Sequence, residues 1–312
     1  MKKFLFLALI LTLICSAAVA DLTFTTGGTA GTYYAYGTVL AQYITANTDL
    51  AVTAIAGNGS AANIDLLDLG DAQLAFVQND VANYAYNGIR FEQYEGAPVT
   101  SFTALAALYD ETVQLITCNP DIKSVADLKG KNVSVGSSGS GTYFNAMDFL
   151  AAYGMTIDDI KPQYLSFGDS AESLKDGKID AAFVVAGAPT PAVTDLCTTK
   201  GAYLIALDDE HVAALQEINA AYGKSVIPAG TYDGINEDVV TVGVKATIIA
   251  GADITDDQAY TIVSTIFENK DALTEAHAKA AELNLEYASV CGLPYHAGAA
   301  KYFAEKGYST AQ

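Results

Sequence analysis

Two segments of the sequence repeat each other, and this repeat constrains the fold more than any other feature does. The first reads LTFTTGGTAGTYY (22–34) and the second VSVGSSGSGTYF (133–144), and a shift of 110 places Gly31 on Gly141. In both, a short apolar run ends in a turn of small residues, after which a helical pattern begins. A second pair follows at a shift of 107, which places Gly70 of GDAQLAFV on Gly177 of GKIDAAFV. Two ordered matches predict two related α/β units.

Within each unit, short apolar runs alternate with helical patterns. Such alternation predicts parallel sheets covered by helices on their faces, so the predicted fold class is α/β. We expect strands at 22–26, 51–56 and 74–77 and helices at 33–46 and 60–68 in the first unit, and strands at 132–135 and 179–185 and a helix at 142–153 in the second.

Two longer extended runs predict how the units are joined. The run 102–118 is a long apolar stretch broken by Asp110 and Glu111, and 238–251 is a second extended run. We interpret both as crossings, in which the chain leaves the first domain near Tyr109 and returns near Val240. Two lobes joined by two crossing strands form a cleft. Domain I then comprises 21–110 and 239–312, with helices near 256–281 and 297–306 packed on it, and domain II comprises 111–238.

The first twenty residues have the pattern of a cleaved signal peptide. Lys2 and Lys3 precede an apolar stretch, and Ala18-Val19-Ala20 has the small-x-small form of a cleavage site before Asp21. Cys15 would permit lipidation, but Ile14 stands where a lipoprotein signal has a small residue. The sequence therefore predicts a mature chain that is periplasmic or otherwise extracytoplasmic.

The net charge and the cysteine content limit which partners, metals and cofactors the protein is expected to bind. The formal net charge is −20, which argues against nucleic acid and anionic membranes because both attract basic surfaces. No cysteine or histidine spacing suggests a metal site, and we expect no cofactor. In an oxidising compartment one disulfide can form. We predict that Cys118 and Cys197 pair, with a buried free thiol as the alternative.

The glycine turn of the second unit has the chemistry of an anion site. At the carboxyl end of a parallel strand, such a turn exposes the unpaired N–H groups and positive dipole end of the next helix. Gly139 and Gly141 allow close approach, and Ser137, Ser140 and Thr142 offer hydroxyl groups. The turn lacks the Gly-Lys-Ser/Thr of a phosphate loop and the third glycine of a dinucleotide fingerprint. A small carboxylate or phosphate remains as ligand.

Three further turns follow predicted strands. AGNGSAAN (56–63) offers Asn58 and Ser60, and FVQND (76–80) offers Gln78 and Asp80. VVAGAPTPAV (184–193) follows the corresponding strand of the second unit. Helix capping is the alternative role for Ser60 and Asp80. The sequence contains no recognisable arrangement of catalytic residues. These side chains are therefore expected to bind a ligand rather than to catalyse a reaction.

Motifs across nearly the whole mature chain resemble one transporter family. TTGGTAGTYYAYG, GNGSAANIDLLDLGDAQLAFVQND, DLKGKNVSVGSSGSGT, DGKIDAAFVVAGAPTPAV, IPAGTYDG, VVTVGVKATIIA and LPYHAGAAKYFAEKG occur in family order. They resemble the substrate-binding subunit of a tripartite ATP-independent periplasmic (TRAP) transporter of the TAXI type. The departures are small: Ala30 stands where the first motif usually has glycine, and Ala297 where proline is usual.

The resemblance implies a two-lobed type II periplasmic binding protein fold. It implies a receptor that captures a small carboxylate, such as glutamate, a related amino acid or 2-oxoglutarate, and delivers it to the TRAP membrane permease subunits. Arg90 is expected to face solvent and is not assigned to the site. The implied ligand-binding residues are Thr29, Tyr33, Asn58, Ser60, Gln78, Asp80, Ser137, Ser140, Gly141, Thr142 and Pro189.

Two other functions stay open at the level of sequence. One is an extracytoplasmic enzyme that acts on a small anionic metabolite in the same cleft, and the other is a surface adhesin without a small ligand. If the protein is a receptor, the expected class of ligand depends on whether Asp80 points into the cleft. An acid in the cleft would attract an ammonium group and so favour an amino acid over a keto acid.

Overall fold

The computed structural model describes residues 21–90 and 92–310, so the predicted signal peptide lies outside the described residues. In the first repeated unit, three parallel strands alternate with helices. Helix packing follows from the sequence: Tyr36, Leu40 and Ile44 recur on the buried face of the first helix. The elements are β1 (Asp21–Thr25), α1 (Thr32–Asn47), β2 (Ala51–Ile55), α2 (Ser60–Asp68), β3 (Leu74–Gln78) and α3 (Asn79–Asn87).

The second repeated unit has the same alternation and additional elements. Its first three strands are again parallel, with the first strand between the other two. The elements are η1 (Val125–Leu128), β5 (Asn132–Ser134), α4 (Gly141–Ala152), η2 (Ile157–Asp159), β6 (Lys161–Gln163), α5 (Phe167–Lys175), β7 (Ala181–Ala186), α6 (Pro191–Thr199), β8 (Tyr203–Leu204), α7 (Asp209–Ile218) and β9 (Gly223–Ile227).

Two long strands connect the units, as the two extended runs predicted. β4 (Phe102–Thr117) and β10 (Val239–Gly251) pair antiparallel in the middle of one ten-stranded sheet. For the described residues the strand order is β2-β1-β3-β10-β4-β7-β5-β6, with β8 beside β4 and β9 beside β10. The order β2-β1-β3 on one side mirrors β6-β5-β7 on the other, which agrees with two related units.

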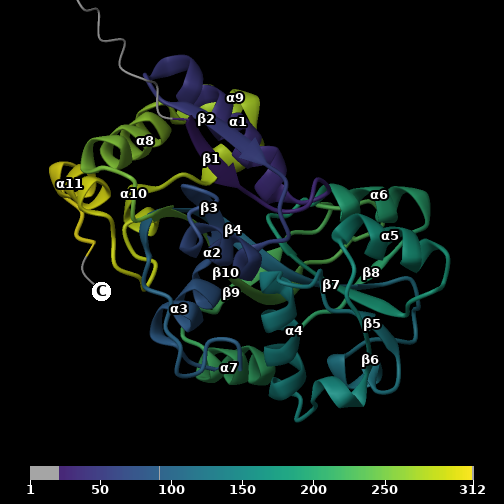
Figure 1. Cartoon of the computed structure of the whole chain (residues 1–312). Coiled ribbons are helices and arrows are strands. Elements are labelled where there is room, and N and C mark those ends of the chain that lie inside the picture. The colour runs from purple at the N-terminus through teal and green to yellow at the C-terminus, as the bar shows by residue number, and fades with distance from the viewer. Residues whose placement is uncertain (1–20, 91, 311–312) are drawn as a thin grey trace, which may run out of the picture.

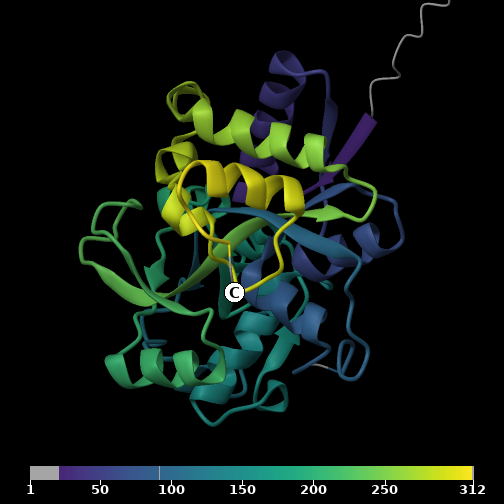
Figure 2. The same cartoon turned by 90° about the vertical axis from the view of Figure 1, so that its left-hand side faces the viewer.

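The chain after β10 returns to the first unit. α8 and α11 pack side by side over that end of the sheet (Figures 1 and 2). The long helix expected near 256–281 is instead interrupted at Asn269, which leaves helical geometry and donates its side-chain amide to Thr265 O at 2.9 Å. These elements are α8 (Asp256–Glu268), α9 (Lys270–Ala276), η3 (Ala278–Glu282), α10 (Leu285–Ala288) and α11 (Ala297–Glu305).

We call β1–β3 with α1–α3 and α8–α11 the first lobe, and β5–β9 with α4–α7 the second lobe. Each lobe has an apolar core on both faces of its half of the sheet. In Figure 1 the helices α5 and α6 lie beyond β7, at the far side of the crossing strands from α8 and α11. No helix of the described ranges is long and apolar enough to cross a lipid bilayer.

Candidate functional site

A cavity lies between the two lobes, against the crossing strand β4. The space that water centres can occupy inside it is about 60 Å³. This arrangement therefore admits only a small solute. Its lining residues are Gly27, Gly28, Gly31, Thr32, Tyr33, Asn58, Gly59, Ser60, Gln78, Glu111, Ser137, Ser140, Gly141, Thr142, Ser166, Phe167, Val185 and Ala186.

Five helices begin at the cavity wall. α1, α2, α4 and α5 each contribute their first residue, and α3 contributes the preceding Gln78. This convergence follows from the parallel strands, because their carboxyl ends meet at the edges that face the cleft. Helix N-termini carry unpaired N–H groups and partial positive charge. The wall therefore favours a ligand with an anionic group.

The start of α4 leaves polar atoms free for a ligand. Ser140 precedes the helix, yet its side chain accepts no capping hydrogen bond. Its Oγ is buried without a hydrogen-bond partner, and the residue is 7% exposed. Buried hydroxyl groups in proteins are normally hydrogen-bonded, so an unpaired one in a cavity wall marks a place for a ligand. Ser137 and Thr142 add hydroxyl groups beside it.

Gly136 permits this turn. Its φ is +88°, and a Cβ built on it would lie 2.6 Å from Ser140 Oγ and 2.7 Å from Thr142 Cβ. A side chain there would strain the backbone and displace the hydroxyl groups that line the cavity.

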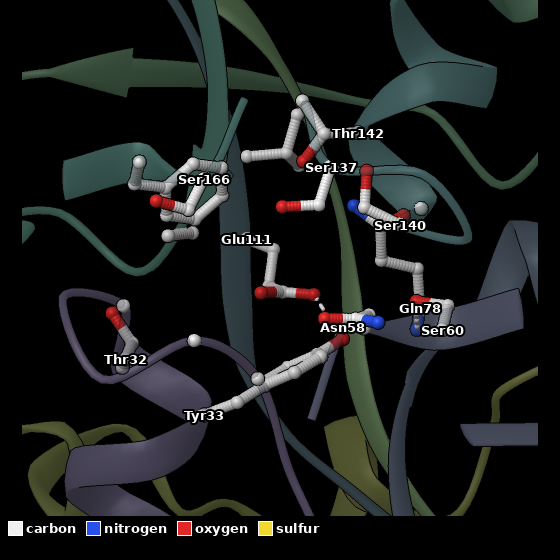
Figure 3. A pocket seen from close by; sticks show the side chains of 18 residues that line it. Thr32, Tyr33, Asn58, Ser60, Gln78, Glu111, Ser137, Ser140, Thr142 and Ser166 are labelled. Carbon is white, nitrogen blue, oxygen red and sulfur yellow. Dashed lines mark hydrogen bonds between the residues drawn. The ribbon is translucent and has the colours of Figure 1, made fainter. Parts of the chain in front are cut away.

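Tyr33 and Glu111 form the floor of the cavity in Figure 3. The Tyr33 ring stacks on Phe76 with 4.7 Å between ring centroids, and its hydroxyl donates to Glu111 Oε2. Glu111 is 2% exposed. Burial raises the pKa of its carboxyl group well above the usual range, and the Tyr33 hydrogen bond offsets part of this rise.

Gln78 connects the cavity to the second lobe. Its backbone N–H donates to Ser60 Oγ at 3.0 Å, and its side-chain amide donates to Asn145 Oδ1 at 2.9 Å. Its Oε1 is buried without a hydrogen-bond partner. A Cβ built on Gly141 would lie 1.6 Å from that oxygen, so only glycine lets the two lobes approach this closely.

Behind the cavity, a buried polar network joins α3 and α4. Asn145 donates to Asp80 Oδ2 and to the Tyr222 hydroxyl, both at 2.8 Å. Tyr222 in turn donates to Asp148 Oδ2 at 3.0 Å, and so does Tyr84 at 3.1 Å. Burial raises the pKa of Asp80 to about 7.

Arg90 completes this network. Arg90 was expected to face solvent, and the residue is exposed. The sequence did not predict its partner: the Arg90 guanidinium forms an ion pair with the fully buried Asp148 of the second lobe, although its side chain is 35% exposed. Arg90 has a positive φ of 79° and lies just beyond the left-handed Gly88 that ends α3.

Hydrogen bonds to backbone carbonyl groups also join the two lobes. Ala62 N–H donates to Gly139 O at 3.0 Å, and Thr32 Oγ1 donates to Gly187 O at 3.0 Å. A Cβ built on Gly59 would lie 3.3 Å from Ser140 Cα. The structure thus presents a closed arrangement of the two lobes.

The structure brings most of the predicted site residues to one place. Their role in ligand binding stays a prediction. Those that line the cavity are Tyr33, Asn58, Ser60, Gln78, Ser137, Ser140, Gly141 and Thr142. Ser60 does not cap its own helix with its side chain, so the capping alternative is wrong for it.

Three predicted site residues do not line the cavity. Thr29 is exposed in the turn before α1, and Thr32 takes the place expected for it. Pro189 is exposed, while Ala186 and Val185 reach the cavity from β7. Asp80 is buried, but its carboxylate faces Asn145 on α4, because the first turn of α3 directs it behind the cavity wall.

Sequence reasoning missed Glu111, Thr32, Ser166 and Phe167. A signal for Glu111 was present, since an acid interrupts the apolar run that forms β4. Ser166 and Phe167 begin α5, whose start no glycine turn marks; there Ser166 Oγ accepts from Asp169 N–H.

The cysteine pairing is also corrected. Cys118, Cys197 and Cys291 are free thiols in the structure. Cys118 packs against the apolar cluster that contains Cys197, but no disulfide joins them. Across 21–90 and 92–310, no group of three or more His, Cys, Asp or Glu side chains could hold a metal ion.

Solved structures with the same architecture define the class of fold. A binding protein component of a phosphonate transporter from Pseudomonas aeruginosa matches with a TM-score of 0.58 and 11% identity, over 85% of this chain and 80% of that one. The arginine-specific periplasmic binding protein of Salmonella typhimurium matches with a TM-score of 0.51 and 13% identity, over 83% and 98%. The fold is therefore that of the type II periplasmic binding proteins. The sequence itself matches the NMT1-like family over residues 24–307, and the chain belongs to that family.

Proposed function

We propose that the protein is an extracytoplasmic solute receptor that captures a small carboxylate between its lobes and delivers it to a membrane transporter. One observation carries the proposal: a cavity enclosed by both lobes where five helices begin, with buried unpaired polar atoms on Ser140 and Gln78. Such a wall can replace the hydration of a small anion from all sides.

The ligands of structural neighbours support a receptor role. The phosphonate-transporter component, the arginine-specific protein and an alkanesulfonate-binding protein from Xanthomonas axonopodis pv. citri bound to MOPS all bear names of small-solute binding (the last with a TM-score of 0.50 and 15% identity, over 92% of this chain and 85% of that one). Their variety leaves the solute open. The finer proposal, a TRAP transporter of the TAXI type and its permease subunits, rests on the motif resemblance.

The carboxylate would lie at the start of α4. Neutral donors hold it there, because no lysine, arginine or histidine is among the lining residues. Hydrogen bonds to a charged group contribute about 1.5–3 kcal/mol each, so four or five can offset desolvation and leave micromolar binding, about −8 kcal/mol. Glutamate, a related amino acid and 2-oxoglutarate are the proposed solutes.

The predicted signal peptide (1–20) and domain limits belong to the same proposal. Domain I would comprise 21–110 and 239–312, and domain II 111–238. The limit at 110/111 falls within β4, next to Thr112, where the pairing of β4 with β10 gives way to its pairing with β7. The limit at 238/239 falls at the start of β10, which pairs there with β9. The lobes would open and close by bending of these two strands.

Native mass spectrometry of protein purified without refolding tests the proposal. We expect one small molecule per chain, released intact on denaturation and unchanged after incubation with fresh protein. Chemical conversion of the released molecule by the protein would instead identify an enzyme. Absence of any retained solute, together with no binding in a calorimetric screen of small carboxylates, would refute the receptor function.

A further inference from the structure

The cavity contains a single carboxylate and no basic side chain among its lining residues. Glu111 lies in the middle of the ring of side chains drawn in Figure 3, and α4 begins on the side away from Tyr33. A ligand that offered only carboxylates could lie beside Glu111 only if Glu111 stayed protonated, because two carboxylates repel each other in a buried space. A ligand with a cationic group would instead find an ionic partner in Glu111.

Glu111 has acceptor capacity left for a ligand. Tyr33 donates to Oε2, whereas Oε1 accepts no hydrogen bond from the described side chains or backbone. Tyr33 is itself fixed by its stacking on Phe76. The floor of the cavity is therefore a rigid acceptor pair, and the start of α4 is a set of donors.

We propose that Glu111 binds an ammonium group of the solute, so that the cavity selects amino acids over the matching 2-oxo acids. The inference rests on the proposed receptor function and names its substrate class. The ammonium group takes the acceptor end at Glu111 and Tyr33. The carboxylate takes the donor end at Ser140, Gly141 and Thr142. A zwitterion thus places its ammonium group against the Glu111 carboxylate and its own carboxylate against the donors of α4, so that neither of its charged groups is buried without a partner.

The surroundings of Glu111 make proton release part of binding. Charged groups act on it from several elements: Asp80 of α3 and Asp110 of β4 raise its pKa, while Lys279 of η3 lowers it. The phenols of Tyr33, Tyr109 and Tyr287 are its other titratable neighbours. Burial is the largest influence and favours the protonated acid in the empty cavity. When an ammonium group arrives, Glu111 ionises, its proton passes to solvent, and the ligand keeps its own protons.

The test compares probes that differ only at the amino group. L-Glutamate is paired with 2-oxoglutarate and L-alanine with pyruvate, and each is titrated calorimetrically into the wild-type protein in phosphate and in Tris. We expect at least one amino acid to bind about 30-fold or more tightly than its 2-oxo partner. The difference in enthalpy between the two buffers should show net proton release, which needs no variant.

Glu111→Gln identifies the residue responsible. It should weaken amino acid binding by about 30-fold and abolish proton release, while binding of the 2-oxo partner is unchanged or tighter. Asp110→Asn is the matched control, because it removes the same charge from the adjacent residue, which bonds to Ser225 and lines no part of this cavity. It should retain the selectivity.

Failure of the inference differs from failure of the receptor function. Equal affinity for both members of a pair, proton uptake on binding, or full selectivity in Glu111→Gln would overturn the ammonium site and leave a receptor for another solute. No retained solute and no binding of any probe would overturn the receptor and the ammonium site together.

Discussion

Gln78 of the first lobe donates its side-chain amide to Asn145 of the second lobe at 2.9 Å. The same side chain presents its other end to the cavity, where Oε1 has no hydrogen-bond partner. Asn145 passes the connection on to Asp80 and Tyr222. Contact with a solute is therefore linked to the buried network that holds the lobes together.

Gly141 is predicted to be essential for closure. In Gly141→Ala, the new methyl group would overlap Gln78 Oε1 at 1.6 Å and crowd Ser60 Oγ at 2.7 Å. The lobes could then no longer approach, and we expect calorimetry to show affinity lower by about 100-fold, equivalent to about 2.7 kcal/mol. Gly223→Ala is the control, since its Cβ would meet nothing within 4 Å. Wild-type affinity in Gly141→Ala would contradict the close approach.

The Arg90–Asp148 ion pair is predicted to favour the closed arrangement. Arg90→Gln leaves the carboxylate of Asp148 buried without its cationic partner. After allowance for partial solvent screening of Arg90, we expect a cost to the closed state of about 1–2 kcal/mol, hence about 5–30-fold weaker solute binding.

Small-angle scattering checks the same prediction. The ligand-free Arg90→Gln protein should have a larger radius of gyration than wild type. Lys129→Gln is the control, because it removes a charge from an exposed pair with Asp159 inside the second lobe. If both variants bind and scatter as wild type does, the pair does not hold the lobes.

The protonation of Asp80 should make the free energy of unfolding depend on pH. Burial raises its pKa from 3.8 to about 7, so the folded state binds a proton that the unfolded state has lost. This contribution to the free energy of unfolding is complete below pH 4. It falls by about 1.4 kcal/mol per pH unit up to about pH 7.

Asp80→Asn removes this titration while keeping an oxygen acceptor for Asn145. Urea unfolding at several pH values should show a shallower decline for the variant than for wild type between pH 4 and pH 7. Parallel curves would mean that Asp80 is ionised in the folded protein.

The exposure of the three cysteines predicts how many thiol groups react in the native and in the denatured protein. Cys197 and Cys291 are buried, whereas Cys118 is partly exposed. A thiol reagent added to unreduced protein that starts at Asp21 should modify one group in the native state and three after denaturation. A single reactive thiol after denaturation would instead show that the predicted disulfide between Cys118 and Cys197 is present.

The sequence predicted well whatever depends on local pattern. Strand and helix positions in the repeated units agree within a few residues, and the glycine turns lie at the cavity because glycine is needed where backbones meet. Gly141 is the clearest case, since its role against Gln78 follows from a missing side chain.

The sequence did not predict the direction in which individual side chains point. Asp80 follows a buried strand and Glu111 lies within one. A helical turn directs Asp80 toward Asn145, while the pleat of β4 directs Glu111 into the cavity. Thr29 and Thr32 differ by less than one helical turn, and only the start of α1 decides between them. The long-range partner of Arg90 depends on the closed arrangement, which no local pattern contains.

The central position of β10 has a consequence for synthesis. This strand pairs with β3 and β4 in the interior of the sheet, although it begins only at Val239. A growing chain that stops before it exposes two apolar strand edges, which invite association with other chains. Neither lobe can therefore finish folding until most of the polypeptide has been made, and a partial chain depends on binding by a chaperone or on remaining unfolded.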